Sequence, residues 1–302
     1  MRVEDINVVD IEENRQHLTK KLLNILLVDR TMGKNIIWAT DSYQIHGKRF
    51  APERQITSAL VTGRFGGLIQ PRAVKSLHEQ VRRTKYNAEV FTPLKSVDLI
   101  NRAVERQTID KNNWQEYVTG LMLEIACGEA PFIASRYNPT SHTGKLIKLS
   151  DRVGFLDRKL KVVSRYCVKR EDWLVWAGEA FKASYGYDWQ GDNVLIARKN
   201  LLYTFIDFYE DKFKHKPTLS VMEEIAEIIS WNIFQMDGLK CVVPMSCKSG
   251  TKRGNDLFGW ITETEYQCEG CKYKQVDKHN GKYVRIMDWA ENRVVKFVEL
   301  IS

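Results

Sequence analysis

The chain has 302 residues, 43% of them hydrophobic, and its 46 Lys and Arg residues exceed its 38 Asp and Glu residues by eight. This composition can fill one large core or two modest cores, which excludes a disordered tail. The basic balance suits a polyanionic partner such as DNA, and it equally suits a protein without such a partner. Apolar runs such as residues 22–28 are far shorter than a bilayer requires, and the N-terminus has no signal-peptide pattern, so we expect a cytoplasmic protein with no membrane partner.

Residues 1–80 predict a mixed α+β N-terminal region. Residues 24–43 are typical of two β-rich runs around a turn at 31–35. Residues 71–87 are charged at helical spacing and carry a basic cluster of Arg72, Lys75, Arg82, Arg83 and Lys85. Two interpretations of this cluster stand side by side, a solvated helix face and a surface that contacts phosphates.

Three strand–loop–helix steps follow and predict a parallel α/β sheet. The first strand, near residues 121–126, breaks at a small-residue loop. The second ends at Asp188, and a long amphipathic helix is predicted to begin near Asp192. The third follows a helix and is closed by Asp237. The long gap between the first two strands predicts an insertion that loops out, roughly residues 136–160, with a turn at 138–141.

Three acids, Glu124, Asp188 and Asp237, therefore end successive strands, where open α/β sheets bind ligands. Cys127 and Gly128 would let the backbone approach a ligand closely. Carboxylates bind amines and hydroxyls rather than phosphates, and the Gly-x-Gly-x-x-Gly motif of dinucleotide sites is absent. S-adenosylmethionine (SAM) suits such a rim, because it carries an ammonium group, a ribose diol and an adenine amino group.

Several stretches resemble gamma-order, amino-group DNA methyltransferases. Residues 88–93, AEVFTP, resemble the Phe/Tyr-Thr-Pro element of that family, and residues 123–132, LEIACGEAPF, resemble its strand-one element. Residues 185–201 and 232–239 are similar to the second and third strand elements. The resemblance covers about residues 70–245 and implies the modification subunit of a restriction-modification system, which transfers a methyl group from SAM to adenine N6 of a flipped base in double-stranded DNA. The implied fold is a partial, mostly parallel, Rossmann-like SAM-dependent methyltransferase sheet at 81–245.

The resemblance also assigns cofactor contacts position by position. Thr92 and Pro93 would hold the carboxylate end of the methionine part, and Glu124 its amino group. Asp188 would bind the ribose hydroxyls and Asp237 the adenine amino group. The remaining cofactor-binding residues are Phe91 of the Phe-Thr-Pro element, Ala126, Cys127 and Gly128 of the close-approach loop, and Phe132 packed beside it.

Each assignment has a structural alternative. Thr92 and Pro93 could merely start a helix, and Glu124 could be a surface carboxylate. Asp188 could be an acid at a helix N-terminus, and Asp237 could belong to a plain turn. Cys127 is interpreted as a small packing residue rather than a nucleophile, because its local motif contains no His.

The Asn/Asp-Pro-Pro-aromatic element, which binds the target amino group in this family, is missing, since no two of the seven prolines are adjacent. Catalytic residues are therefore unknown. The chain is expected to be a half completed by a second polypeptide, a truncated protein, or a catalytically incomplete SAM- or DNA-binding partner of a split modification enzyme; a restriction subunit is a further partner. A half sheet would also expose an unpaired edge. A small-molecule methyltransferase on the same sheet is the remaining alternative.

Residues 246–302 form a Cys-rich C-terminal region. The six cysteines of the chain do not suggest a disulfide framework. A structural zinc site is predicted, with reduced thiols as the alternative and His279 as a spare ligand. Its four proposed ligands are Cys241, Cys247, Cys268 and Cys271. The basic stretch 247–256 is interpreted as a loop.

Overall fold

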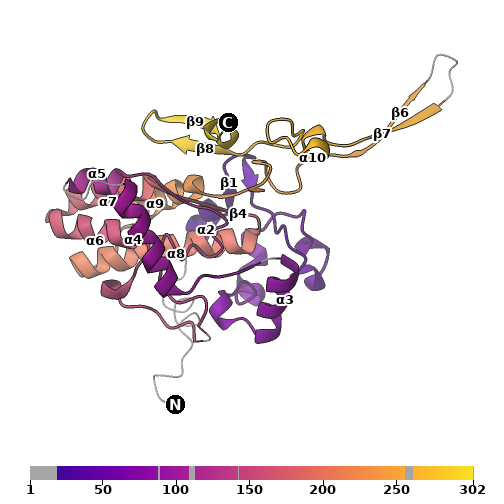
Figure 1. The fold of residues 1–302 in the computed structure, drawn as a ribbon. Helices are drawn as coiled ribbons and strands as arrows, with labels where there is room; N and C mark the ends of the chain where they lie inside the picture. The colour runs from indigo at the N-terminus through magenta and orange to yellow at the C-terminus, as the bar shows by residue number, and fades with distance from the viewer. Residues whose placement is uncertain (1–18, 88, 109–112, 142, 256–260, 302) are drawn as a thin grey trace.

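The computed structural model describes residues 19–87, 89–108, 113–141, 143–255 and 261–301. Its centre is a three-stranded parallel sheet with the strand order β3-β4-β5 (Figure 1). The strands are β3 (Met122–Glu124), β4 (Ser184–Asp188) and β5 (Ile233–Gln235). The helices that connect them are α6 (Phe155–Tyr166), α7 (Arg170–Lys182), α8 (Gly191–Phe213) and α9 (Leu219–Asn232). The predicted mixed α/β class with a parallel sheet is confirmed at this level.

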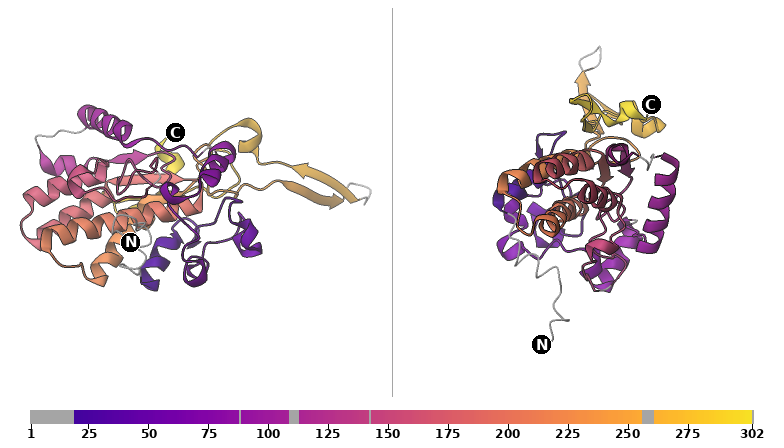
Figure 2. Two further views of the ribbon diagram at one scale, coloured as in Figure 1. Left: turned by 90° about the horizontal axis from the view of Figure 1, so that it is seen from below. Right: turned by 90° about the vertical axis from the view of Figure 1, so that its left-hand side faces the viewer.

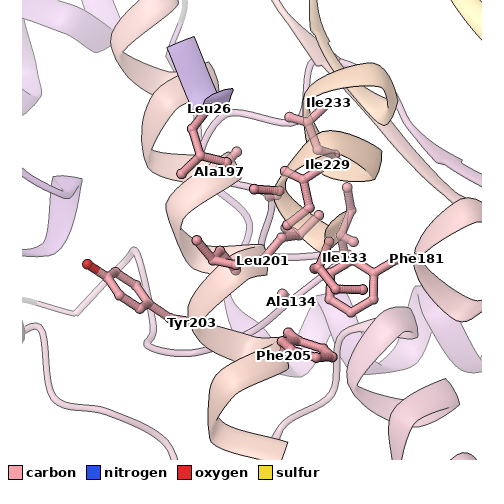
Figure 3. Close-up of a cluster of buried hydrophobic side chains, with 14 of the residues drawn as sticks. Leu26, Ile133, Ala134, Phe181, Ala197, Leu201, Tyr203, Phe205, Ile229 and Ile233 are labelled. Carbon is pink, nitrogen blue, oxygen red and sulfur yellow. The ribbon is translucent and has the colours of Figure 1, made fainter. Parts of the chain in front are cut away.

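Helix α8 is the central element of the helical layer. It is buried along most of its length, and its buried residues include polar ones such as Asp192, Arg198 and Asn200. Figure 3 shows Ala197, Leu201 and Phe205, four residues apart on α8, in one cluster with Phe181 of α7 and Ile229 of α9. Because α8 begins directly after the loop that follows β4, this core fixes the position of the strand's carboxyl end.

The N-terminal region begins with α2 (Lys20–Leu27), followed by the antiparallel pair β1 (Val28–Asp29) and β2 (Lys34–Asn35). The two predicted β runs around a turn are therefore present but short. Residues 24–27 are helical rather than extended, because four leucines at helical spacing form one buried face of α2 against α8 and α9. The first eighteen residues, including the predicted N-terminal signal-free stretch, lie outside the described residues.

Short 3-10 turns lead from β2 to the next helices. They are η2 (Gln44–His46), η3 (Lys48–Phe50), η4 (Ser58–Leu60), η5 (Gly63–Phe65) and η6 (Arg72–Val74). The helices that follow are α3 (Leu77–Asn87), α4 (Leu94–Thr108) and α5 (Trp114–Thr119). Helix α4 begins directly after Pro93, as the sequence predicts.

The connection from β3 to β4 corrects the predicted insertion. The described part of residues 136–154 contains η7 (Leu149–Asp151) and an isolated β-bridge between Tyr137 and Leu146, and the Asn138 carbonyl accepts a hydrogen bond from the Ser141 amide in the predicted turn. This segment is not loose, because the buried guanidinium groups of Arg136 and Arg152 both bind Asp207 of α8. Residues 155–160 do not loop out at all, since they form the first turns of α6 within the core.

The second face of the sheet is covered by the C-terminal segment. Tyr185 and Tyr187 of β4 and Phe234 of β5 pack there against a separate apolar cluster. This layer comes from β8 (Arg285–Asp288), β9 (Arg293–Lys296) and η8 (Phe297–Leu300). The predicted boundaries near residues 80 and 245 remain predictions, but one apolar core joins α2 to the helices of the sheet, and the C-terminal segment is its outer layer.

In the chain between β5 and β8, an antiparallel hairpin of β6 (Gly250–Asn255) and β7 (Ile261–Tyr266) extends away from the body of the molecule (Figures 1 and 2). Helix α10 (Glu269–Tyr273) follows it. The prediction of a loop at residues 247–256 is wrong for 250–255, because their backbone groups pair with residues 261–266. This pairing requires a second strand, and the composition of residues 250–255 alone does not show it.

The predicted unpaired edge is present on β3. Within the described residues this strand pairs with β4 alone. The Met122 amide binds Ala183 before β4, so the backbone groups of Leu121, Leu123 and Ile125 turn toward the outer edge. Their side chains are 77%, 43% and 68% exposed. An apolar open edge of this kind is a site of strand pairing with another chain.

We therefore expect the double substitution Leu121→Lys and Leu123→Lys to reduce self-association, because charged edge residues oppose edge-to-edge pairing. Light scattering over a range of protein concentrations measures this. Val175→Lys, which changes an exposed apolar residue of α7, is the control and should leave the scattering unchanged. Equal scattering of the double variant and the unmodified chain would contradict an adhesive β3 edge.

Candidate functional site

Two adjoining cavities lie at the carboxyl ends of the three strands. The larger, of about 740 Å³, is lined by residues that follow all three strands, among them Asp188 and Asp237. The smaller, of about 530 Å³, lies beside β3 and α4 and includes Glu124. Both are lined by Phe91, Ala126 and other residues between them, so they form one continuous rim region.

Asp188 is the last residue of β4 and is 8% exposed. Its Oδ1 accepts a hydrogen bond from the Gln190 amide at 2.8 Å, and its Oδ2 accepts one from the Gly128 amide at 2.9 Å. Burial raises the pKa of Asp188 to about 6, although these two amide hydrogen bonds act to lower it. The carboxylate thus joins the loop after β3 to the start of α8, and it also faces the larger cavity.

Gly128 makes this arrangement possible. Its φ of +53° lies in the left-handed region, and a Cβ there would come within 2.9 Å of the Phe91 ring. The ring of Phe91 in turn lies under the guanidinium group of Arg72, 5.2 Å from it. Phe91 of the Phe-Thr-Pro element and Gly128 of the small-residue loop are therefore in direct contact, so the two motifs form one part of the site.

Glu124 is buried at the end of β3, so the alternative of a surface carboxylate is wrong. Its two oxygens accept hydrogen bonds from the amides of Phe132 and Ile133, at 3.3 Å and 3.2 Å. Burial raises the pKa of Glu124 well above its usual range, against these two hydrogen bonds. The side chain thus holds the loop after β3 closed while it lines the smaller cavity.

Asp237 lies two residues after β5 and lines the larger cavity with Asp188. Its Oδ1 accepts the Leu239 amide at 3.1 Å, and its Oδ2 lies 3.2 Å from the Lys240 ammonium group. It therefore shapes a turn, as the structural alternative expects, and it also presents a carboxylate to the cavity. Gly238 is required in this turn, because a Cβ would come within 2.8 Å of the Tyr187 ring.

Three of the other predicted residues line the smaller cavity, and one lines neither cavity. Thr92, Cys127 and Phe132 line the smaller cavity, whereas Pro93 lines neither and precedes α4. Cys127 is 2% exposed, and burial raises the pKa of its thiol well above the ordinary value. A protonated, enclosed thiol of this kind fits a packing residue rather than a nucleophile.

One wall of the larger cavity was not predicted. Ala39 and Thr40 line it, and the Trp189 indole N–H binds the Ala39 carbonyl at 2.8 Å. The side chain of Gln235 on β5 holds this segment by bonding both the amide and the carbonyl of Ile37. The sequence contains no local signal for this contact, since it joins residues almost 200 positions apart.

The basic cluster of residues 72–85 is, as a whole, neither a solvated helix face nor a surface that contacts phosphates. Arg83 is fully buried and donates hydrogen bonds to Asp192 at 2.7 Å and to Glu89 at 2.9 Å. The Lys75 ammonium group lies 3.6 Å from the same Asp192 carboxylate. These two cations stabilise the fold beside the cavity and are not available as a phosphate-binding surface. Lys85 remains exposed on α3, next to Tyr86.

A second group of chemically active side chains lies in the C-terminal segment. Cys247, Cys268, Cys271 and His279 place their ligand atoms within 4.8 Å of one another and could bind a metal such as zinc. Cys241 is not in this group, which corrects the predicted four-cysteine set. It is fully buried in the apolar cluster on the second face of the sheet, and the spare candidate His279 occupies the fourth position.

Comparisons with protein-family models, with curated proteins and with solved structures gave no match to this chain. Among the described residues, no helix has the length and apolar character needed to cross a bilayer.

Proposed function

We propose that this protein binds SAM at the carboxyl ends of β3, β4 and β5, on a Rossmann-like sheet, and that it is the modification subunit of an adenine-N6 DNA methyltransferase, which transfers the methyl group to a flipped adenine. The observation that carries the proposal is the convergence of Asp188, Asp237 and the Gly128 loop on one cavity. A sheet of neighbouring parallel strands binds its ligands at this end.

The donor set of the cavity fits this cofactor in charge and in polarity. Asp188 and Asp237 offer hydrogen-bond acceptors to hydroxyl and amino groups, and buried carboxylates repel phosphates. The cavity of about 740 Å³ lies within the range of small-molecule sites. Phe91 and Trp189 add aromatic surface for a flat base. Bound SAM would supply an electrophilic methyl group on a sulfonium centre.

Three of the predicted contacts have a geometric basis in the chain, whereas Pro93 lines neither cavity. Asp188 retains lone pairs for ribose hydroxyls beyond the two amides that it already accepts. Glu124 faces the adjoining cavity, where an ammonium group would restore the charge balance of a buried carboxylate. Gly128 keeps the loop close enough for backbone contact with a ligand.

A second candidate is a catalytically incomplete SAM-binding partner of a split modification enzyme. Two observations favour it. No two prolines are adjacent, so the chain offers no Pro-Pro-aromatic element for the target base. The edge of β3, next to the smaller cavity, presents exposed apolar residues that a partner's strand could cover.

The test measures two quantities on the full chain. Isothermal titration calorimetry measures SAM binding, and transfer of a labelled methyl group measures adenine methylation of double-stranded DNA. We expect binding in both cases, with turnover for the first candidate and none for the second. Absence of SAM binding would overturn both candidates.

The raised pKa of Asp188 predicts a pH dependence of binding. With a pKa of about 6, Asp188 is mostly neutral at about pH 5 and ionised at about pH 7.5. If the ionised carboxylate binds the ribose, SAM affinity should rise by up to about tenfold between these pH values. The described residues that line this cavity include no histidine that would mimic this effect. Calorimetry over this pH range should give a shallower profile for Asp188→Asn, and the pH dependence that remains is assigned to Glu124, whose pKa is also raised by burial. An equally steep profile would contradict the assignment of Asp188.

Stability should change in the opposite direction. The folded-state pKa of Asp188 lies above its ordinary value, so the folded state holds the proton more tightly than the unfolded chain. The contribution of this group is present below about pH 4 and is lost as the pH rises through about 6. Binding and stability measurements on the same samples therefore separate the two effects.

A further inference from the structure

The four side chains of the Cys/His group come from separate points along the C-terminal segment. Cys247 precedes β6, Cys268 follows β7, Cys271 lies in α10, and His279 lies in the loop before β8. His279 Nδ1 lies 3.6, 3.5 and 3.6 Å from the sulfur atoms of Cys247, Cys268 and Cys271.

These distances are those of a tetrahedral centre. Zinc bonds of about 2.3 Å to sulfur and about 2.0 Å to nitrogen, at tetrahedral angles, place each sulfur roughly 3.5 Å from the nitrogen. The three observed separations agree with this value. Three thiolates and one imidazole form a closed coordination sphere, which is typical of structural rather than catalytic zinc.

Two glycines let the backbone approach the side chains of the Cys/His group closely. A Cβ at Gly270 would come within 2.7 Å of the His279 ring, and a Cβ at Gly281 within 3.0 Å of the Cys247 sulfur. The Asn280 amide lies 3.3 Å from the Cys268 sulfur and donates a hydrogen bond to it, as outer contacts of metal-bound thiolates do.

We propose that Cys247, Cys268, Cys271 and His279 bind one Zn²⁺ ion, and that this ion clamps the base of the β6–β7 hairpin to the body of the protein. Cys247 lies three residues before β6 begins and Cys268 two residues after β7 ends, so the ion joins both ends of the hairpin. A two-stranded hairpin is marginally stable by itself, and Figures 1 and 2 show this one extending from the body.

The clamp continues into the sheet. Val284 donates a backbone hydrogen bond to Cys241, and Val243 donates one to Lys282. The neighbouring Val242 carbonyl accepts the amide of Asp237, at the end of β5. The zinc centre therefore connects the hairpin, through two short paired segments, to the turn that follows β5. This inference does not depend on the proposed methyl-transfer function.

Metal analysis of the purified full chain tests the ligand set. We expect about one zinc per chain in the unmodified protein and in Cys241→Ala, and almost none in Cys268→Ser or His279→Ala. Cys241→Ala is the matched control, because it removes a buried cysteine outside the cluster. A zinc-free protein, or loss of zinc in Cys241→Ala with retention in His279→Ala, would overturn the proposed set.

A chelator experiment on the unmodified chain avoids any folding defect of the variants. Trypsin cleaves after Lys and Arg, and the hairpin segment, taken as residues 247–268, contains such targets at Lys248, Lys252 and Arg253. We expect chelation to speed cleavage there at least tenfold, while the chain outside residues 247–279 is cut at its former rate, and added Zn²⁺ to restore protection. An unchanged cleavage rate in the hairpin segment after complete zinc removal would overturn the clamp.

Discussion

Replacement of Asp188 by alanine is expected to weaken SAM binding by about 1 to 3 kcal/mol, or roughly 5- to 150-fold. The reason is that the substitution removes the acceptor for the ribose hydroxyls and leaves the amides of Gly128 and Gln190 without their partner. Both losses occur in a site where the carboxylate is 8% exposed, so water cannot fully replace it. Calorimetry on the full chain measures the change.

The control is Asp211→Ala, which removes an exposed carboxylate of α8 outside both cavities. It should bind SAM like the unmodified protein. A SAM analogue without ribose hydroxyls separates direct contact from loop disorder: the unmodified protein should bind it more weakly than SAM, whereas Asp188→Ala should not distinguish the two. Unchanged affinity of Asp188→Ala for SAM would show that the ribose assignment is wrong.

Replacement of Arg83 by methionine should lower the free energy of unfolding by about 3 to 5 kcal/mol, the usual cost of removing one partner from a buried ion pair. Asp192 and Glu89 are also buried, and the carboxylates around Arg83 raise its pKa above the ordinary value although burial acts to lower it. Without Arg83 two carboxylates lose their main cationic partner. Urea denaturation measures the effect.

Arg102→Met provides the matched control. Arg102 lies on the neighbouring helix α4 and pairs with Asp98 one turn away, but its side chain is 57% exposed. Exposed pairs of this kind contribute about 0.3 to 0.5 kcal/mol, so its loss should be close to neutral. The double variant Arg83→Met and Asp192→Asn should recover part of the stability, because it removes one of the uncompensated charges. A neutral Arg83→Met variant would contradict a structural role for this ion network.

Asp188, which is expected to bind SAM, and the ion network of Arg83 lie in one region of the structure. Asp192 is the second residue of α8 and lies four residues after Asp188, and the Tyr43 hydroxyl also binds it at 2.7 Å. Glu89 lines the larger cavity and pairs with Arg83. The ion network therefore supports the cavity wall, and a variant that weakens it should reduce SAM affinity through the wall rather than through direct contact.

The sequence by itself determined the parallel sheet and the order of its rim residues. β3 ends in Glu124 and β4 in Asp188, and Asp237 follows β5 by two residues. These acids are local signals, since each short strand and the acid at its end are visible in nearly consecutive residues. The start of α4 after Pro93 and of α8 near Asp192 follow from the same local rules. The cysteine spacing likewise predicts a metal group.

Only the tertiary structure decided which side chains meet. It placed His279 rather than Cys241 with the other cysteines, because the pairing of residues 282–284 with 241–243 turns Cys241 into the apolar layer. It buried Arg83 against Asp192, 109 positions away, where the helical charge pattern predicts either a solvated face or a surface that contacts phosphates. Contacts of this kind depend on chain segments brought together by the core, and no local pattern of residues records them.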